Sequence, residues 1–247
     1  MLQRIKEYFD RKLRQRALRG NSVVCPCCKG HFLTFLPGGV VTKRPHALCP
    51  GCGSLERHRL LWHFVQHKTT LLSKPHKVLH VAPEPLFFQL FSQNPGIDYV
   101  PCAKFGEGYE DEYPVGTINI DLTDIDFPDE TFDVILCSHV LEHIPNDQQA
   151  MRELHRVLKP TGWAILQVPL DLSREKTYED FSITRLEARE KAFGQRDHVR
   201  VYGRDYPARL AQAGFAVQAH EATLMYSQQE IFRYGFDKYE SVFYCQK

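Results

Sequence analysis

The chain has 247 residues, a net charge of +1 at pH 7 and 43% hydrophobic residues. A chain of this length can hold a small module together with one α/β domain that has a substantial core. The balanced charge argues against a general affinity for nucleic acid or membrane surfaces. No run of apolar residues is long enough to predict a transmembrane segment.

The first part of the chain is the exception to this charge balance. Residues 1–20 contain seven Lys or Arg residues against two acidic ones, and Leu2, Ile5, Phe9 and Leu13 fall on one face of a predicted helix. A basic amphipathic helix can lie on a membrane, contact phosphates or dock against another subunit. The interpretation we favour is a solvated helix that covers the module that follows.

Two Cys-x2-Cys pairs, Cys25 with Cys28 and Cys49 with Cys52, enclose a pattern typical of a hydrophobic hairpin. Two such pairs can complete a closed tetrahedral site for zinc, which leaves no position open for a substrate. We therefore predict a structural zinc ribbon over residues 21–54, with Cys27 as the spare thiol. Disulfides are the alternative, but no secretory segment is visible, and we expect a cytoplasmic protein.

A connecting helix and linker are predicted over residues 55–75, followed by alternating strands and helices. Arg57, His58 and Arg59 either extend a basic patch or occupy exposed helix positions. Strands are expected at 77–81, 98–102, 118–121, 132–137, 163–168 and 214–217, with helices at 85–93, 148–158 and 205–213. Ligands of open α/β sheets lie outside the carboxyl ends of the strands, so Asp121, residues 137–139 and residues 168–170 should converge.

Two motifs carry a resemblance to a known family. They are Asp121 with the segment 127–135, reading FPDETFDVI, and the segment 156–160, reading RVLKP. These residues resemble the class I S-adenosylmethionine-dependent methyltransferases, specifically the type 11 branch. The resemblance covers about residues 76–220 and implies a Rossmann-like methyltransferase sheet with helices on both faces, which the small zinc-ribbon module would precede.

The resemblance also implies cofactor contacts. Asp121 would accept from the adenine amino group while Leu122 offers its backbone N–H, a pairing that reads adenine; the alternative for Asp121 is a strand-end cap. Cys137 and Ser138 would lie beside the cofactor at the end of their strand.

The first nucleotide loop departs from the family pattern. His80, Ala82 and Glu84 stand where the family has an acid and two glycines, which let the backbone approach the cofactor. Either Glu84 pairs with the ammonium group of the cofactor, or the loop has lost cofactor binding. The acid expected for the ribose hydroxyls is also missing, because Ala103 and Lys104 occupy its place.

Histidines supply the candidate bases. His139 is the first choice to deprotonate an oxygen or nitrogen nucleophile, and His198 is the second. His143 is expected to pack or hydrogen-bond at the start of its helix. A metal role is a further alternative, since the segment 139–143 is partly similar to the Glu-x-x-Glu-His motif that binds a divalent ion in small-RNA 3′-end methyltransferases. The first acid of that motif is missing here.

A polar insertion near residues 171–200 is predicted to form a substrate lid. Asp197, His198, Arg200 and Tyr202 either bind a polar or anionic acceptor or form an ordinary network that orients the next helix.

The resulting prediction is an S-adenosylmethionine-dependent methyltransferase with a structural zinc ion and a catalytic domain over residues 76–247. The acceptor is unidentified, with a small molecule or glycan favoured over RNA. A zinc-ribbon RNA methyltransferase and a non-catalytic adaptor with a degenerate methyltransferase domain remain as alternatives. The sequence leaves the oligomeric state open.

Overall fold

The structure is a computed structural model that describes residues 11–39, 43–106 and 113–247. It divides into two compact units. The N-terminal unit contains the described residues up to Leu72 together with His220–Val242, and the sheet unit contains Ser73–Ala219 and Phe243–Lys247. The structure groups His220–Val242 with the N-terminal unit, whereas the sequence predicts one domain over residues 76–247.

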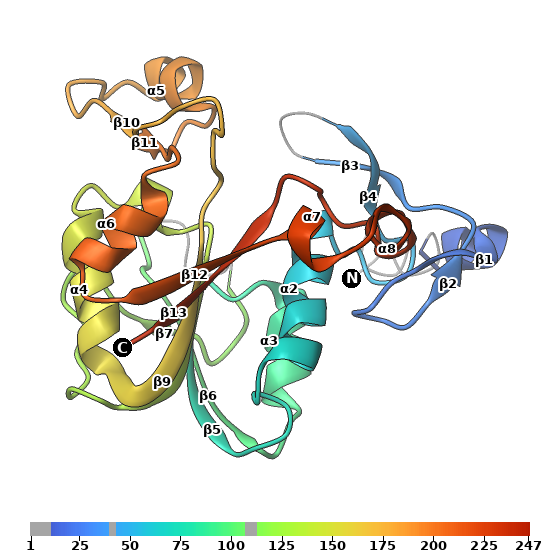
Figure 1. Cartoon of the computed structure of the whole chain (residues 1–247), viewed down its shortest axis with the longest axis horizontal. Coiled ribbons are helices and arrows are strands. Elements are labelled where there is room, and N and C mark those ends of the chain that lie inside the picture. Colours follow the sequence, from blue (N-terminus) through green and yellow to red (C-terminus); the bar gives the residue numbers. More distant parts are fainter. Residues whose placement is uncertain (1–10, 40–42, 107–112) are drawn as a thin grey trace. The chain divides into compact units, whose positions relative to one another are not determined.

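A seven-stranded sheet forms the centre of the fold, with the strand order β12-β13-β9-β8-β5-β6-β7 (Figure 1). The β7-β6, β6-β5, β5-β8 and β8-β9 pairs are parallel, and β13 runs antiparallel to β9. The strands are β5 (His76–Val81), β6 (Ile97–Ala103), β7 (Ile118–Asn119), β8 (Phe132–Ser138), β9 (Leu158–Gln167), β12 (Ala216–Glu221) and β13 (Ser241–Gln246).

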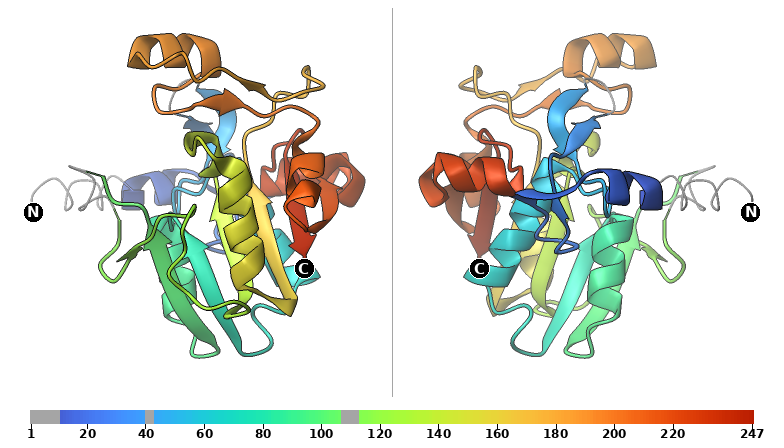
Figure 2. Two further views of the ribbon diagram at one scale, coloured as in Figure 1. Left: turned by 90° about the vertical axis from the view of Figure 1, so that its left-hand side faces the viewer. Right: turned by 90° about the vertical axis from the view of Figure 1, so that its right-hand side faces the viewer.

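Helices cover both faces of this sheet, as the resemblance implied. Helix α3 (Pro85–Ser92) lies on one face, and α4 (Asp147–Val157) lies on the other, where it contacts α6 (Tyr206–Gln212) (Figure 2). The central strands are buried on both faces, which explains their nearly continuous apolar sequence. The predicted Rossmann-like fold class is confirmed.

The two motifs that carried the resemblance contact each other. Arg156 donates to Asp129 and to the backbone carbonyls of Ile125 and Phe127, at 2.8 Å in each case. Lys159 donates to Asp133 at 2.7 Å. These bonds fix the loop that follows Asp121, so the second motif positions the first.

The insertion folds into a small hairpin and a helix. Strand β10 (Tyr178–Glu179) pairs with β11 (Arg200–Val201), and α5 (Leu186–Phe193) lies between them in the sequence. Arg200 is 1% exposed and donates to the carbonyls of Leu141, Ile144 and Pro145. Tyr202 is fully buried and donates to Asp147 at 2.7 Å. Arg200 and Tyr202 therefore belong to the internal network that was the alternative to acceptor binding.

The N-terminal unit contains two short antiparallel hairpins and three named helices. The hairpins pair β1 (Arg19–Val24) with β2 (His31–Phe32) and β3 (Leu36–Gly38) with β4 (Arg44–Leu48). The helices are α2 (Glu56–Lys68), α7 (Ala222–Met225) and α8 (Gln228–Tyr234). Residues 11–17 are also helical, and Leu13 is 63% exposed. The rest of the predicted amphipathic face, Leu2, Ile5 and Phe9, lies outside the described residues.

Arg59 joins the C-terminal segment to the rest of the N-terminal unit. Its guanidinium is fully buried and donates to four backbone carbonyls, those of Ala47, Ser54, Tyr234 and Gly235. Both interpretations of Arg59 from the sequence, a basic patch or an exposed helix position, are wrong. A guanidinium carries five donors, so one buried side chain can satisfy carbonyls from several loops at once.

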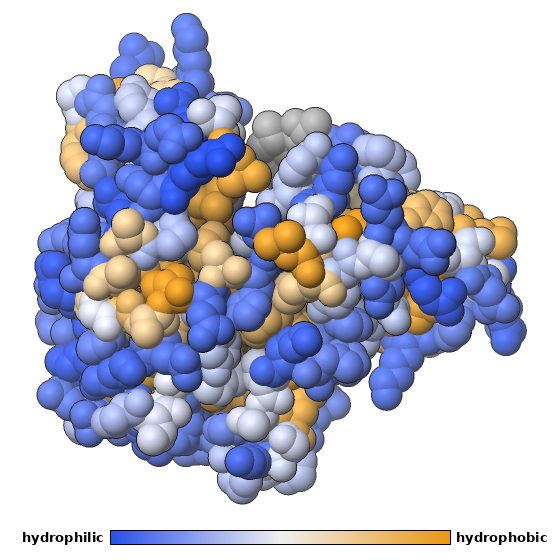
Figure 3. All heavy atoms as spheres, viewed as in Figure 1, coloured by the Kyte–Doolittle hydropathy of each residue, from blue (hydrophilic) through white to orange (hydrophobic). Residues whose placement is uncertain are grey.

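Hydrophilic side chains predominate on the face drawn in Figure 3, and hydrophobic ones occur between them in patches. Within the described ranges, no helix is both long and apolar enough to cross a bilayer.

Candidate functional site

A cavity of about 540 Å³ lies at the carboxyl ends of four neighbouring parallel strands, β7, β6, β5 and β8. Each strand, or one of the first residues after it, contributes to the wall, as expected for an open α/β sheet. The lining residues are Val81, Ala82, Ala103, Lys104, Tyr113, Asp121, Leu122, Thr123, His139, Val140, His143, Ile144, Pro145, Asn146 and Asp197.

Asp121 is the carboxylate at the β7 side of the cavity. One oxygen accepts from the Thr123 backbone N–H at 2.9 Å and the Thr123 hydroxyl at 2.8 Å, and the other accepts from Lys104 Nζ at 2.5 Å. Partial burial raises the pKa of Asp121, but the hydrogen bonds from Lys104 and Thr123 outweigh it and lower the pKa to about 2. Asp121 is therefore an ionised acceptor at neutral pH, as the adenine contact requires.

The first nucleotide loop places one of its three predicted residues at the cavity. Ala82 lines the wall and has a φ of 47°, a left-handed conformation that favours glycine. His80 is 1% exposed and lies below the wall, with Nδ1 2.8 Å from the Tyr99 hydroxyl and Nε2 3.5 Å from Glu84. Neither His80 nor Glu84 lines the cavity, so Ala82 alone of the three is placed for direct cofactor contact.

The end of β8 separates the residues predicted there. Cys137 is fully buried in the core behind the sheet, and that burial raises the pKa of its thiol well above the usual value. Ser138 is half-buried and is not part of the wall. His139 lines the cavity, with a φ of 57°. Because successive strand residues point to opposite faces, Cys137 turns toward the core.

The two histidines predicted as bases occupy different environments. His139 Nδ1 lies 3.5 Å from Glu142 Oε1, and His139 Nε2 has no hydrogen-bond partner among the described residues. His198 is 5% exposed and does not line the cavity; its ring contacts that of His143 edge to face at 4.8 Å. Burial lowers the pKa of His198, so its imidazole is neutral at pH 7.

Several wall residues were not predicted from the sequence. From the sequence, Lys104 is only the residue that stands in place of an acid that binds the ribose. In the structure, its ammonium group forms an ion pair with Asp121. Tyr113 and Asn146 also line the cavity. Asn146 is the N-cap residue of α4, and its side chain accepts from Gln149 N at 3.2 Å. This capping pattern is the sequence feature that could have indicated its position. A cap at the start of a helix after a parallel strand lies at the ligand edge of the sheet.

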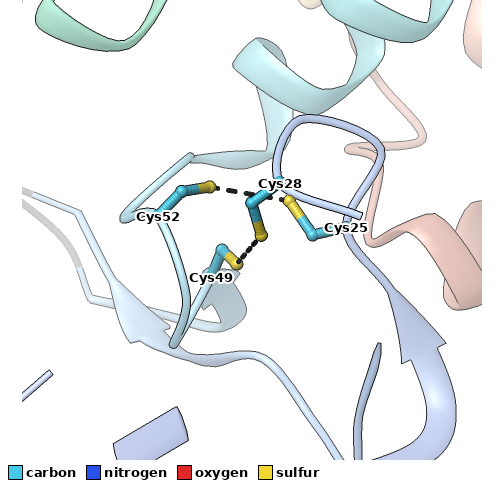
Figure 4. A group of neighbouring side chains, drawn as sticks. All are labelled: Cys25, Cys28, Cys49 and Cys52. Carbon is cyan, nitrogen blue, oxygen red and sulfur yellow. Dashed lines mark hydrogen bonds between the residues drawn. The ribbon is translucent and has the colours of Figure 1, made fainter. Parts of the chain in front are cut away.

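The four predicted zinc ligands form a separate cluster in the N-terminal unit (Figure 4). Cys25 and Cys52 have their sulfurs 3.7 Å apart, those of Cys28 and Cys49 are 3.8 Å apart, and all four lie within 4.8 Å of one another. A tetrahedral zinc site with Zn–S bonds of about 2.3 Å has sulfurs about 3.8 Å apart. The cysteines are free thiols, and the residues present fit a zinc ion.

Cys27 lies outside this cluster, as its role of spare thiol requires. Its sulfur is 3.7 Å from the His58 carbonyl oxygen, and the residue is buried. Gly30 and Gly51 allow the knuckles to close, because a Cβ on either would lie within 3.2 Å of Cys28 Sγ and closer still to the Phe32 ring. Neither glycine can be replaced without a rearrangement around the sulfurs.

Comparisons with known proteins agree with this geometry. Residues 48–166 match the family profile described as "Methyltransferase domain". A stretch of 76 residues is 34% identical to the demethylmenaquinone methyltransferase of Lysinibacillus sphaericus, over 30% of each chain. The chain spans less than a third of the length of the curated relatives it matches.

Two solved structures share the fold. A SAM-dependent methyltransferase from Archaeoglobus fulgidus is 12% identical with a TM-score of 0.50, over 77% of this chain and 94% of that one. An S-adenosylmethionine-dependent methyltransferase from Mesorhizobium loti is 13% identical with the same TM-score, over 75% and 97%. The family match thus covers residues 48–166, and the central sheet with its helices has the fold of S-adenosylmethionine-dependent methyltransferases.

Proposed function

We propose that this chain is an S-adenosylmethionine-dependent methyltransferase whose N-terminal unit is held together by a structural zinc ion. The observation that carries the proposal is the ionised Asp121 carboxylate in a cavity at the carboxyl ends of four parallel strands. Asp121 would accept from the adenine amino group, and the Leu122 backbone would contact the ring. S-adenosylmethionine, when bound, supplies an electrophilic methyl group.

His139 would act as the base for the acceptor. Its unpartnered Nε2 can take a proton, and Glu142 beside Nδ1 would stabilise the imidazolium that forms. The acceptor oxygen or nitrogen would give up its proton to His139 Nε2, and S-adenosylmethionine would supply the methyl group that this atom receives. His198 is the second candidate, although its burial outside the cavity wall requires a relay through another group.

The acceptor proposed is a small molecule or glycan. The net charge of +1 gives the chain as a whole no bias toward RNA, although a zinc-ribbon RNA methyltransferase has the same domain order. A steep fall of RNA affinity with rising salt would favour RNA instead. A non-catalytic adaptor is the other candidate, and the observation in its favour is Ala82, whose Cβ stands where the family has a glycine.

Calorimetry on zinc-replete protein tests the function. We expect S-adenosylmethionine and S-adenosylhomocysteine to bind, and Asp121→Ala to weaken both by about 10- to 100-fold, as expected for the loss of hydrogen bonds to a charged group. Asp124→Ala is the matched control, because Asp124 is an exposed acid in the same loop and is not part of the wall. If the folded wild-type chain bound neither compound, the result would contradict the proposal and favour the non-catalytic adaptor.

A further inference from the structure

Three potential metal ligands lie close together beside the cavity. The proposed methyl transfer does not require all three. Glu142 and His143 come from the short helix η1 (Leu141–His143), and His198 follows α5 in the insertion. One ligand atom from each lies within 4.8 Å of the other two. Ligand atoms with bonds of about 2.1 Å to one ion are about 3.0 to 4.2 Å apart, so the three atoms need to approach one another by at most about 2 Å.

Glu142 is the reason to expect a cation at this point. The residue is 1% exposed, and its Oε2 is buried without a hydrogen-bond partner among the described residues. Its other oxygen is 3.5 Å from His139 Nδ1, which is long for a hydrogen bond. A buried carboxylate that lacks partners is costly, and buried charges are normally paired or bound to a metal.

Both imidazoles are oriented as metal-binding histidines are. His143 Nδ1 lies 3.2 Å from the Asp197 carboxylate, and the His198 ring hydrogen-bonds to the Phe193 backbone carbonyl. Metal-binding histidines usually donate one ring N–H to a carboxylate or a carbonyl, which fixes the ring and leaves the second nitrogen for the ion. Each ring here therefore has one nitrogen engaged and one left to bind.

We propose that Glu142, His143 and His198 bind one first-row divalent cation, such as Mn²⁺ or Fe²⁺, at the edge of the cavity. Two imidazoles and one carboxylate suit these ions better than Ca²⁺ or Mg²⁺, which prefer oxygen ligands alone. Three protein ligands leave coordination positions open, and His143 and Asp197 both line the cavity. An oxygen of a molecule bound in the cavity can fill such a position, but ion binding itself depends on neither the cofactor nor methyl transfer.

Electron paramagnetic resonance with Mn²⁺ tests the site on the full chain, prepared with one zinc ion per chain. Mn²⁺ is a poor competitor for thiolate ligands, so the four-cysteine cluster does not interfere. We expect one bound Mn²⁺ per chain. Glu142→Gln should weaken its binding by about tenfold or more, and His143→Asn should do the same at a half-buried position where folding is less at risk.

Asp121→Ala is the matched control, since Asp121 lines the same cavity outside the cluster. It should keep Mn²⁺ while it weakens S-adenosylmethionine, whereas Glu142→Gln, at a buried residue that is not part of the wall, should weaken Mn²⁺ while it keeps S-adenosylmethionine. This opposite pair separates failure of the metal site from failure of the proposed function. The inference is overturned if folded wild-type protein binds no Mn²⁺, or if His143→Asn binds it as tightly as the wild type does.

Discussion

Ala82 shows how a single residue can retain a backbone conformation for which its side chain is poorly suited. Its φ of 47° lies in the left-handed region, where an L-residue with a Cβ pays about 1 kcal/mol relative to glycine. We expect Ala82→Gly to raise the free energy of unfolding by up to about 1 kcal/mol in urea denaturation, less the extra chain entropy that glycine loses on folding. The substitution also removes a methyl group from the cavity wall.

Ala103→Gly is the matched control for this prediction. Ala103 also lines the cavity but lies at the end of β6, where it is 1% exposed and has no left-handed backbone. Glycine in a strand is destabilising by about 0.5 to 1 kcal/mol, so this variant should shift stability in the opposite direction. Equal destabilisation by both variants would show that the conformation of Ala82 carries no strain.

The sequence predicts individual site residues where a motif fixes both their place and their direction. Asp121 and Leu122 line the cavity, and both follow a strand at the ligand edge. His80 and Cys137 are not part of the wall, since the side to which each strand residue turns depends on how the strand packs. The ion pair between Lys104 and Asp121 joins residues that follow two different strands, so no local sequence pattern predicts it.

At the scale of the element, α2 carries a histidine whose protonation opposes folding. His63 faces the rings of Tyr226, Tyr234 and Phe236, and its Nδ1 is 2.9 Å from the Tyr226 hydroxyl. Burial, and then the charge of His67, lower the pKa of His63 to about 4 from 6.5. In the unfolded chain this histidine takes up a proton below about pH 6.5, whereas in the folded chain it does so only near pH 4.

The N-terminal unit should therefore lose stability as the pH falls from about 6.5 to 4. The folded state binds fewer protons in this window, so acid favours unfolding, and the contribution of His63 is on the order of 2 kcal/mol. We expect His63→Gln to lose less stability than the wild type between pH 7.5 and pH 5 in urea denaturation. His31→Gln, at an exposed position in the same unit, should follow the wild-type profile; a wild-type profile for His63→Gln as well would contradict the prediction.

Elements with a strong hydrophobic period were predicted well, and those that depend on distant contacts were not. The strands β5 and β8 and the helix α4 are within two residues of their predicted bounds, because the strands are buried on both faces and one side of the helix is apolar. The short helices α7 and α8 were not predicted. The end of α8 is bonded to Arg59, which lies 175 residues before Tyr234 in the chain.

At the scale of the whole molecule, the four-cysteine cluster suggests that the N-terminal unit would depend on a bound metal for its stability. Its two hairpins are short, and the four cysteine sulfurs join their knuckles at one point. The cysteines that bind zinc would be thiolates, and their negative charge attracts the buried guanidinium of Arg59. Arg59 in turn holds the carbonyls of Tyr234 and Gly235, so residues 220–242 depend on the same cluster.

Removal of zinc should therefore unfold the N-terminal unit, including residues 220–242, although these residues lie far from the cysteines in the sequence. We expect hydrogen exchange after chelation to show lost protection in α2 and α8, while β5 and β8 in the sheet unit keep theirs, because binding energy at a structural zinc site is folding energy. Cys28→Ser should have the same effect without a chelator, and Cys27→Ser should not, since its sulfur lies outside the cluster. Protection that persists in α8 while α2 loses it would show that Arg59 does not couple the two segments.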